Sequence, residues 1–72
     1  MDIDYKGYRI TVLAKDDDGK WRGNYQLVII GKTDSKSIRK EYLHDPFDSQ
    51  QGALTFADNA ARTWIDRNPI AL

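Results

Sequence analysis

The strongest constraint on the fold is a helical pattern between residues 47 and 68. Its apolar residues fall on one continuous stripe of an α-helix, which comprises Ala53, Leu54, Ala57, Ala60, Ala61, Trp64 and Ile65. Asp48 or Ser49 can cap the start, and Asn68 followed by a proline stops the pattern. The sequence therefore predicts a helix over about residues 49–67. Because the stripe is rich in alanine, we expect the helix to lie close against a sheet.

Two segments before this helix alternate as strands do. Residues 8–15 (YRITVLAK) and 20–30 (KWRGNYQLVII) are rich in β-branched and aromatic side chains, and an Asp-Gly turn signal separates them. We expect a loop in which Lys15 pairs with Lys20 and Val12 with Gly23, because this register puts the apolar rows of both strands on one face. Gly23 then leaves a gap on that face, which we expect Trp64 to fill.

A third strand is expected at residues 37–43 (SIRKEYL), at the edge of the sheet. We expect Ile38 to face Ile29 and Lys40 to face Leu27, with Tyr42 also on the helix side. An inward lysine on an edge strand guards against aggregation between sheets.

These elements predict a single α+β domain over residues 1–72. It is a three-stranded antiparallel β-meander (about 8–15, 20–30 and 37–43) with one C-terminal α-helix (about 49–67) packed on one face.

Composition narrows the function of such a domain. The 72 residues include no cysteine, which excludes disulfides and thiolate chemistry. No apolar run approaches the roughly 20 residues that span a bilayer, so we expect no membrane association. The first residues lack the pattern of a signal peptide, and the expected location is therefore cytoplasmic.

Two short motifs resemble ion or phosphate sites without completing their patterns. Residues 31–33 (GKT) resemble the end of a phosphate-binding loop, but Gln26 stands where the first glycine belongs, and a strand follows instead of a helix. Residues 16–18 (DDD) resemble part of a calcium loop, but Ala14 and Tyr25 occupy ligand positions of that pattern. We therefore expect no metal site and no cofactor.

The single histidine, His44, lies beside Asp45 in an expected loop. A triad or a zinc site needs partners at hydrogen-bonding or ligand distance, and the sequence indicates none for His44. One helix on three strands also offers little concavity for a substrate. We expect no catalytic residue and a protein that is not an enzyme.

A single helix leaves one face of the expected sheet uncovered. In the register above, this face mixes basic, polar and apolar side chains, and it is the part of the fold that is free to bind something. The candidate partner-binding residues on it are Arg9, Leu13, Arg22, Asn24, Gln26, Val28, Ile30 and Arg39.

Three interpretations of this face stay open. It is a solvated surface, an interaction surface for a protein partner or a second copy, or a nucleic-acid surface. Apolar residues at the strand ends favour the protein partner. The alternative, RNA or DNA binding, draws on residues 20–40, which carry six basic and one acidic residue, a net charge of +5 in a chain whose total is zero.

The segments WRGNYQL at 21–27 and PFDSQQGALTFADNAARTWID at 46–66 resemble a group of small bacterial β-β-β-α proteins. The resemblance covers most of the chain, rests on structural residues and implies no activity. The order of elements is also similar to the C-terminal part of double-stranded-RNA-binding domains. That family carries lysines at the start of its last helix, whereas here the helix begins Ser49-Gln50-Gln51-Gly52-Ala53. The likeness is therefore one of architecture.

Overall fold

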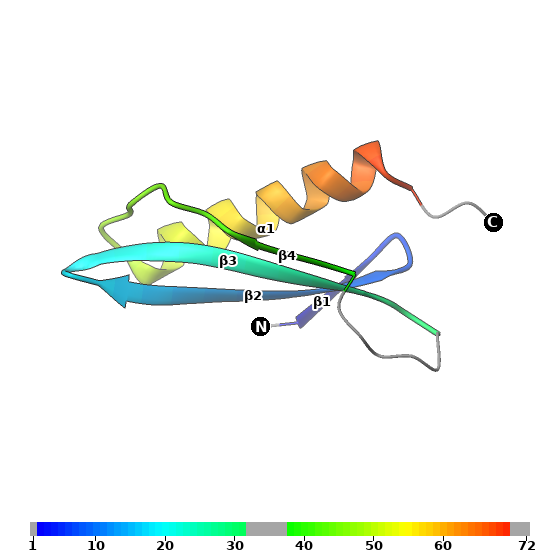
Figure 1. The fold of residues 1–72 in the computed structure, drawn as a ribbon, viewed down its shortest axis with the longest axis horizontal. Coiled ribbons are helices and arrows are strands. Elements are labelled where there is room, and N and C mark those ends of the chain that lie inside the picture. Colours follow the sequence, from blue (N-terminus) through cyan, green and yellow to red (C-terminus); the bar gives the residue numbers. More distant parts are fainter. Residues whose placement is uncertain (1, 32–37, 70–72) are drawn as a thin grey trace.

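Four antiparallel strands and one helix make up the fold in the computed structural model, which describes residues 2–31 and 38–69 (Figure 1). The strands follow one another across the sheet in chain order, and the helix packs on one face. The elements are β1 (Asp2–Tyr5), β2 (Tyr8–Asp17), β3 (Lys20–Ile29), β4 (Arg39–Tyr42) and α1 (Gln50–Arg67). The α+β class is confirmed, but the sheet has four strands where three were expected.

The additional strand is β1, at the N-terminal edge. It joins β2 through a two-residue turn at Lys6 and Gly7, whose φ angles of 48° and 86° are those of a tight hairpin turn. Ile3 lies opposite Ile10 and so adds to the apolar side of the sheet. The alternation of β1 did not indicate a strand in the sequence, because aspartate, which fills every second position of β1, is depleted in strands.

The hairpin of β2 and β3 turns at Asp18 and Gly19, with φ angles of 55° and 84°. The expected four-residue loop was wrong, and Ala14 rather than Val12 lies opposite Gly23. The observed register differs from the expected one by two residues. Side chains of a strand point to alternate faces with a period of two, so a shift of two keeps each side chain on its face. The apolar faces of both strands were therefore assigned correctly although the pairing was not.

β4 differs from the expected third strand by one residue. Leu27 pairs with Arg39 and Tyr25 with Glu41, so the side chains of Arg39 and Glu41 share the helix side of the sheet. Lys40 consequently lies on the opposite face. A slip of one residue exchanges the faces of a whole strand. Position 37, where the strand was expected to begin, lies outside the described residues.

The chain stays beside β3 after β4 ends. The backbone N–H of Leu43 donates to the carbonyl of Gly23 (2.9 Å), and Phe47 and Trp21 exchange both backbone hydrogen bonds at 2.8 and 2.9 Å. The three residues between Leu43 and Phe47 bulge away from the ladder and include His44.

α1 confirms the predicted stripe, and its N-cap is Ser49, whose hydroxyl accepts from the backbone N–H of Gly52 at 3.0 Å. Ala53, Ala57, Ala61 and Ile65 are buried. The gap at Gly23 is filled by the helix backbone rather than by Trp64. A Cβ at Gly23 would lie 2.6 Å from the carbonyl oxygen of Ala53.

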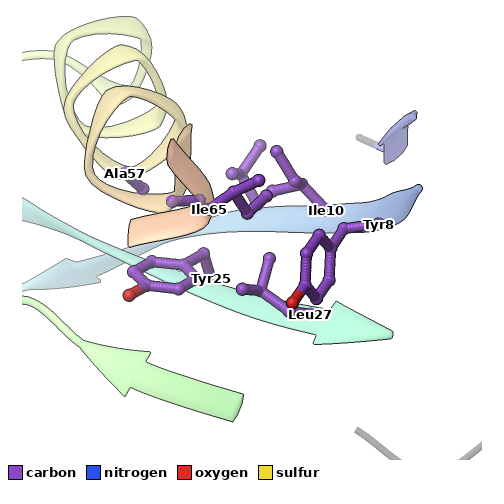
Figure 2. Packing of buried hydrophobic residues seen from close by; sticks show 8 residues of the cluster. Tyr8, Ile10, Tyr25, Leu27, Ala57 and Ile65 are labelled. Atoms are coloured by element: carbon purple, nitrogen blue, oxygen red, sulfur yellow. The ribbon is translucent and has the colours of Figure 1, made fainter. Parts of the chain in front are cut away.

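The core lies between α1 and the two long strands (Figure 2). Tyr25, Ile10, Leu27, Ile65 and Val12 are its largest fully buried side chains. Trp64 is half-buried at the margin, with its ring edge-on to Tyr8 at a centroid distance of 6.0 Å. Within residues 2–31 and 38–69, no helix has the length and apolar character needed to cross a membrane.

Candidate functional site: the uncovered sheet face

α1 covers one face of the sheet, and no other described element lies over the opposite face (Figure 1). We call this opposite face the outer face. By strand register, its side chains are those of Asp2, Asp4, Arg9, Thr11, Leu13, Lys15, Asp17, Lys20, Arg22, Asn24, Gln26, Val28, Lys40 and Tyr42.

The structure brings most of the sequence-predicted residues together. Six of the eight candidates lie on the outer face: Arg9, Leu13, Arg22, Asn24, Gln26 and Val28. Ile30 follows the end of β3, where its backbone N–H donates to the carbonyl of Gly7 at 3.0 Å, and its side chain is exposed. The placement of Arg39 on this face was wrong, because Arg39 lies on the helix side.

Two residues that the sequence interpretation turned inward, Lys40 and Tyr42, belong to the outer face. The signal that would have placed them is the pair Arg39 and Glu41. These side chains stand two residues apart on the same side of β4 and form an ion pair at 3.0 Å. Alternation alone could not show which side chains of β4 face the helix, because both faces of this segment mix charged and apolar residues.

One row of the outer face, running from β2 to the edge strand β4, carries exposed apolar surface. Leu13, Asn24 and Tyr42 form one row across β2, β3 and β4. Leu13 is 54% exposed and Tyr42 is 68% exposed. Two large, exposed side chains thus lie in one row on β2 and β4, with Asn24 of β3 between them.

Ion pairs neutralise much of the charge around this patch. Arg9 contacts Asp4 and Arg22 contacts Asp17, each through Nε at 3.0 Å. The hydrogen bond with the Asp4 carboxylate raises the pKa of Arg9 above its ordinary value. The outer face holds five basic and three acidic side chains. The register expected from the sequence gave five basic side chains and one acidic side chain. Its positive potential is correspondingly weaker than expected.

Two cations stay available for a partner. Among the residues that the structure describes, no carboxylate forms an ion pair with Lys15 or Lys40. Lys20, at the end of the sheet, pairs with Asp48, and this hydrogen bond lowers the pKa of the Asp48 carboxyl. Lys15 and Lys40 therefore flank the row of Leu13 and Tyr42 with uncompensated charge.

A shallow depression of about 250 Å³ opens beside Tyr42. It lies where the chain bulges after β4, and Arg22 spans it by donating from Nε to Asp17 and from Nη1 to the backbone carbonyl of His44. The lining residues are Lys15, Asp17, Arg22, Gly23, Asn24, Tyr42, Leu43 and His44. The position of His44 depends on the bulge, which the sequence did not indicate.

A second polar cluster lies on the helix side of β4. The hydroxyl of Tyr25 donates to the Glu41 carboxylate, and Arg39 donates to both the Tyr25 oxygen and Glu41 at 3.0 Å. Burial raises the pKa of Tyr25, whereas the hydrogen bond from Tyr25 lowers the pKa of Glu41. The guanidinium of Arg39 also stacks 5.1 Å from the ring centroid of Trp64.

This cluster borders a depression of about 340 Å³ between β4 and α1, which we call the edge depression. It is lined by Tyr25, Arg39, Glu41, Ala60, Thr63, Trp64 and Arg67. Within residues 2–31 and 38–69, no group of three or more His, Cys, Asp or Glu side chains is arranged to hold a metal ion.

Comparisons with known proteins find no family model that matches the sequence, no curated protein that matches it and no solved structure that matches the fold.

Proposed function

We propose that the protein is a small interaction module that binds a protein partner through the outer face. The observation that carries the proposal is the exposure of Leu13 (54%) and Tyr42 (68%) in one row of a sheet face that α1 leaves uncovered. Exposed apolar surface of this kind is unfavourable in water and becomes favourable when a partner covers it.

The surroundings of this row support a protein partner. Protein interfaces combine an aromatic and apolar centre with a polar rim, and Tyr and Arg contribute disproportionately to their binding energy. On the outer face, Leu13 and Tyr42 supply the apolar and aromatic surface, and Arg9, Arg22 and Lys40 lie on the same face. The ion pairs of Arg9 and Arg22 also hold these long side chains in place before binding.

The proposal is one of binding rather than catalysis. His44 and Tyr42 at the first depression are exposed, and Asp17 is engaged by Arg22. The side chains of the outer face are suited to contact and hydrogen bonding with another surface.

Self-association is one form of the same proposal. One row of the outer face runs across all four strands. It begins at Asp2 on the edge strand β1 and ends at Lys40 on the other edge strand, β4. Two outer faces related by a twofold axis parallel to the strands would place Asp2 of one copy over Lys40 of the other, and such charge complementarity favours pairing. Sedimentation across a wide concentration range separates this homodimer from a different partner.

Nucleic-acid binding is the second candidate, and Tyr42 is the observation that favours it. An exposed aromatic ring among Lys15, Arg22 and Lys40 offers a base-stacking surface beside cations. Titration of labelled protein with single-stranded RNA and DNA at low salt tests this candidate. Shifts of the Lys15, Arg22 and Tyr42 amides support it, and unchanged amides exclude it.

Affinity capture from cell lysate with matched variants tests the main proposal. Leu13→Asp adds a charge to the centre of the outer face, whereas Asn59→Asp adds the same charge to the exposed surface of α1. A partner of the outer face is lost from Leu13→Asp and retained by Asn59→Asp and by the unmodified protein. Equal capture by all three proteins contradicts the proposal.

A further inference from the structure

No described residue forms a backbone hydrogen bond with the outer edge of β4. N–H groups alternate in direction along a strand, and the N–H of Leu43 donates toward β3, to Gly23. The N–H and C=O groups of Tyr42 and Lys40 therefore point away from β3. No described strand lies beyond β4, so this edge is a template for an additional strand.

The edge depression lies directly against this strand. Its lining includes the half-buried ring of Trp64, the small side chain of Ala60 and Arg67 in the last turn of α1. Arg39 and Glu41 neutralise each other, whereas Arg67 forms no ion pair with any described residue. The lining of the depression therefore combines apolar surface with one cation, Arg67, in excess of the Arg39–Glu41 ion pair.

From these two features we infer that an extended, acidic peptide segment of a partner binds by adding a strand to β4. This mode is distinct from the outer-face contact, because the backbone of the segment would hydrogen-bond to Lys40 and Tyr42. In strand addition, the main chain supplies affinity and the alternate side chains supply specificity. The inference stands whether or not the outer face binds a protein.

The charges on both sides of β4 select the chemistry of the segment. Side chains of an added strand would alternate between the outer face, where they meet Lys40 and Tyr42, and the helix side, where they meet the Arg39–Glu41 ion pair and, on α1, Arg67 and Trp64. Both sides offer a cation next to an aromatic ring. A lysine on an edge strand disfavours pairing with an uncharged or basic strand. Acidic residues on the added strand attract the lysine and so favour pairing.

β1 is the other edge of the sheet, and it lacks this chemistry. Its outward side chains on the outer face are Asp2 and Asp4, which would repel an acidic segment. A second copy of the protein could present its own β1 to β4, but this head-to-tail contact does not close and would produce open-ended assemblies. Growth of such assemblies with concentration is therefore a separate outcome of the test.

The probe is a short synthetic peptide, blocked at both ends, in which Glu alternates with Val. Labelled protein is titrated with it to millimolar concentration and followed by amide chemical shifts and hydrogen exchange. The amides of Lys40 and Tyr42 should shift and gain protection, whereas a peptide with Lys in place of Glu should leave them unchanged.

Three variants separate the backbone contact from the side-chain contacts. Tyr42→Pro removes the outward N–H, which an edge strand tolerates, and should abolish binding, whereas Tyr42→Ala keeps the N–H and should weaken binding only by the loss of the ring contact. Arg67→Glu, at an exposed position, should weaken binding about tenfold. A spectrum with native dispersion shows that each variant is folded.

Several results would overturn the inference. They are the absence of any shift at millimolar Glu–Val peptide, equal affinity of Tyr42→Pro and Tyr42→Ala, and shifts confined to Arg9 and Leu13 on β2. Sedimentation that shows concentration-dependent polymers lost in Asp2→Lys would assign the β4 edge to a second copy instead.

Discussion

Gly23 and Ala53 lie so close that a single methyl group cannot fit between them. A Cβ at Gly23 would lie 2.6 Å from the backbone carbonyl oxygen of Ala53 and 3.0 Å from the Cβ of Ala57. The first of these contacts is with backbone, which cannot rotate away. This approach fixes how α1 lies on β3, and it explains the alanine-rich stripe of the helix.

Replacing Gly23 by alanine should therefore destabilise the protein by about 2–3 kcal/mol, as overpacking of a close contact does. The helix must move away from β3 and loosen the core. Urea unfolding measures the loss, and Asn24→Ala, on the outer face of the same strand, is the control with little expected effect. A Gly23→Ala protein as stable as the control would show that α1 does not rest on Gly23.

Trp64 contributes less to stability than a buried aromatic residue would. The sequence placed it in a gap at Gly23, but it is half-buried between Tyr8 and Arg39. Trp64→Ala should cost about 1–3 kcal/mol, and truncation of the fully buried Ile65 to alanine should cost more, about 2–5 kcal/mol. The reverse order in urea unfolding would contradict the assigned helix face.

The turn at Gly19 gives a test of the corrected hairpin. Its φ of 84° is strained for any residue with a side chain, so Gly19→Ala should cost about 1–2 kcal/mol. Lys15→Ala, on the outer face of β2, is the control. A neutral Gly19→Ala would favour the longer loop that the sequence indicated.

Glu41 gives the protein a pH dependence whose sign follows from its environment. The hydrogen bond from Tyr25 lowers the pKa of Glu41 below its ordinary value of 4.5. A carboxyl whose pKa is lower in the folded state stabilises that state above its unfolded pKa, and this stability is lost as the pH falls through the folded pKa. Stability should therefore fall under acidic conditions, below about pH 4.5.

Tyr25→Phe removes the donor and should move the pKa of Glu41 upward, toward its ordinary value. Carboxyl carbon shifts recorded through an acid titration measure this directly. The carboxyl of Asp66, whose pKa is lowered by hydrogen bonds from Lys6 and Tyr5, is far from this change and serves as the internal reference. An unchanged Glu41 titration would show that Tyr25 does not set its pKa.

The sequence predicted what depends on local pattern. The stripe and caps of α1 determined its limits, and the alternation of β2 and β3 determined which of their side chains face the core. Because six of the eight candidate residues lie on these two strands, most of the proposed site followed from that alternation.

The remaining features depend on contacts between distant residues. The face of β4 is set by the hydrogen bonds of Arg39 and Glu41 to Tyr25, which a periodic pattern cannot reveal. Lys40 and Tyr42 were misplaced for that reason. The loop length was misjudged because two registers that differ by two residues bury the same faces.

The binding of a partner by the outer face is the central claim, and one spectrum tests it most directly. Isotope-labelled protein is added to cell lysate, and the intensity of each amide signal is compared with that in buffer. We predict selective loss of signal at Leu13, Asn24 and Tyr42, whereas the signals of Thr55 and Asn59 on the exposed side of α1 are retained. Uniform intensities, or losses centred on Thr55 and Asn59, would contradict it.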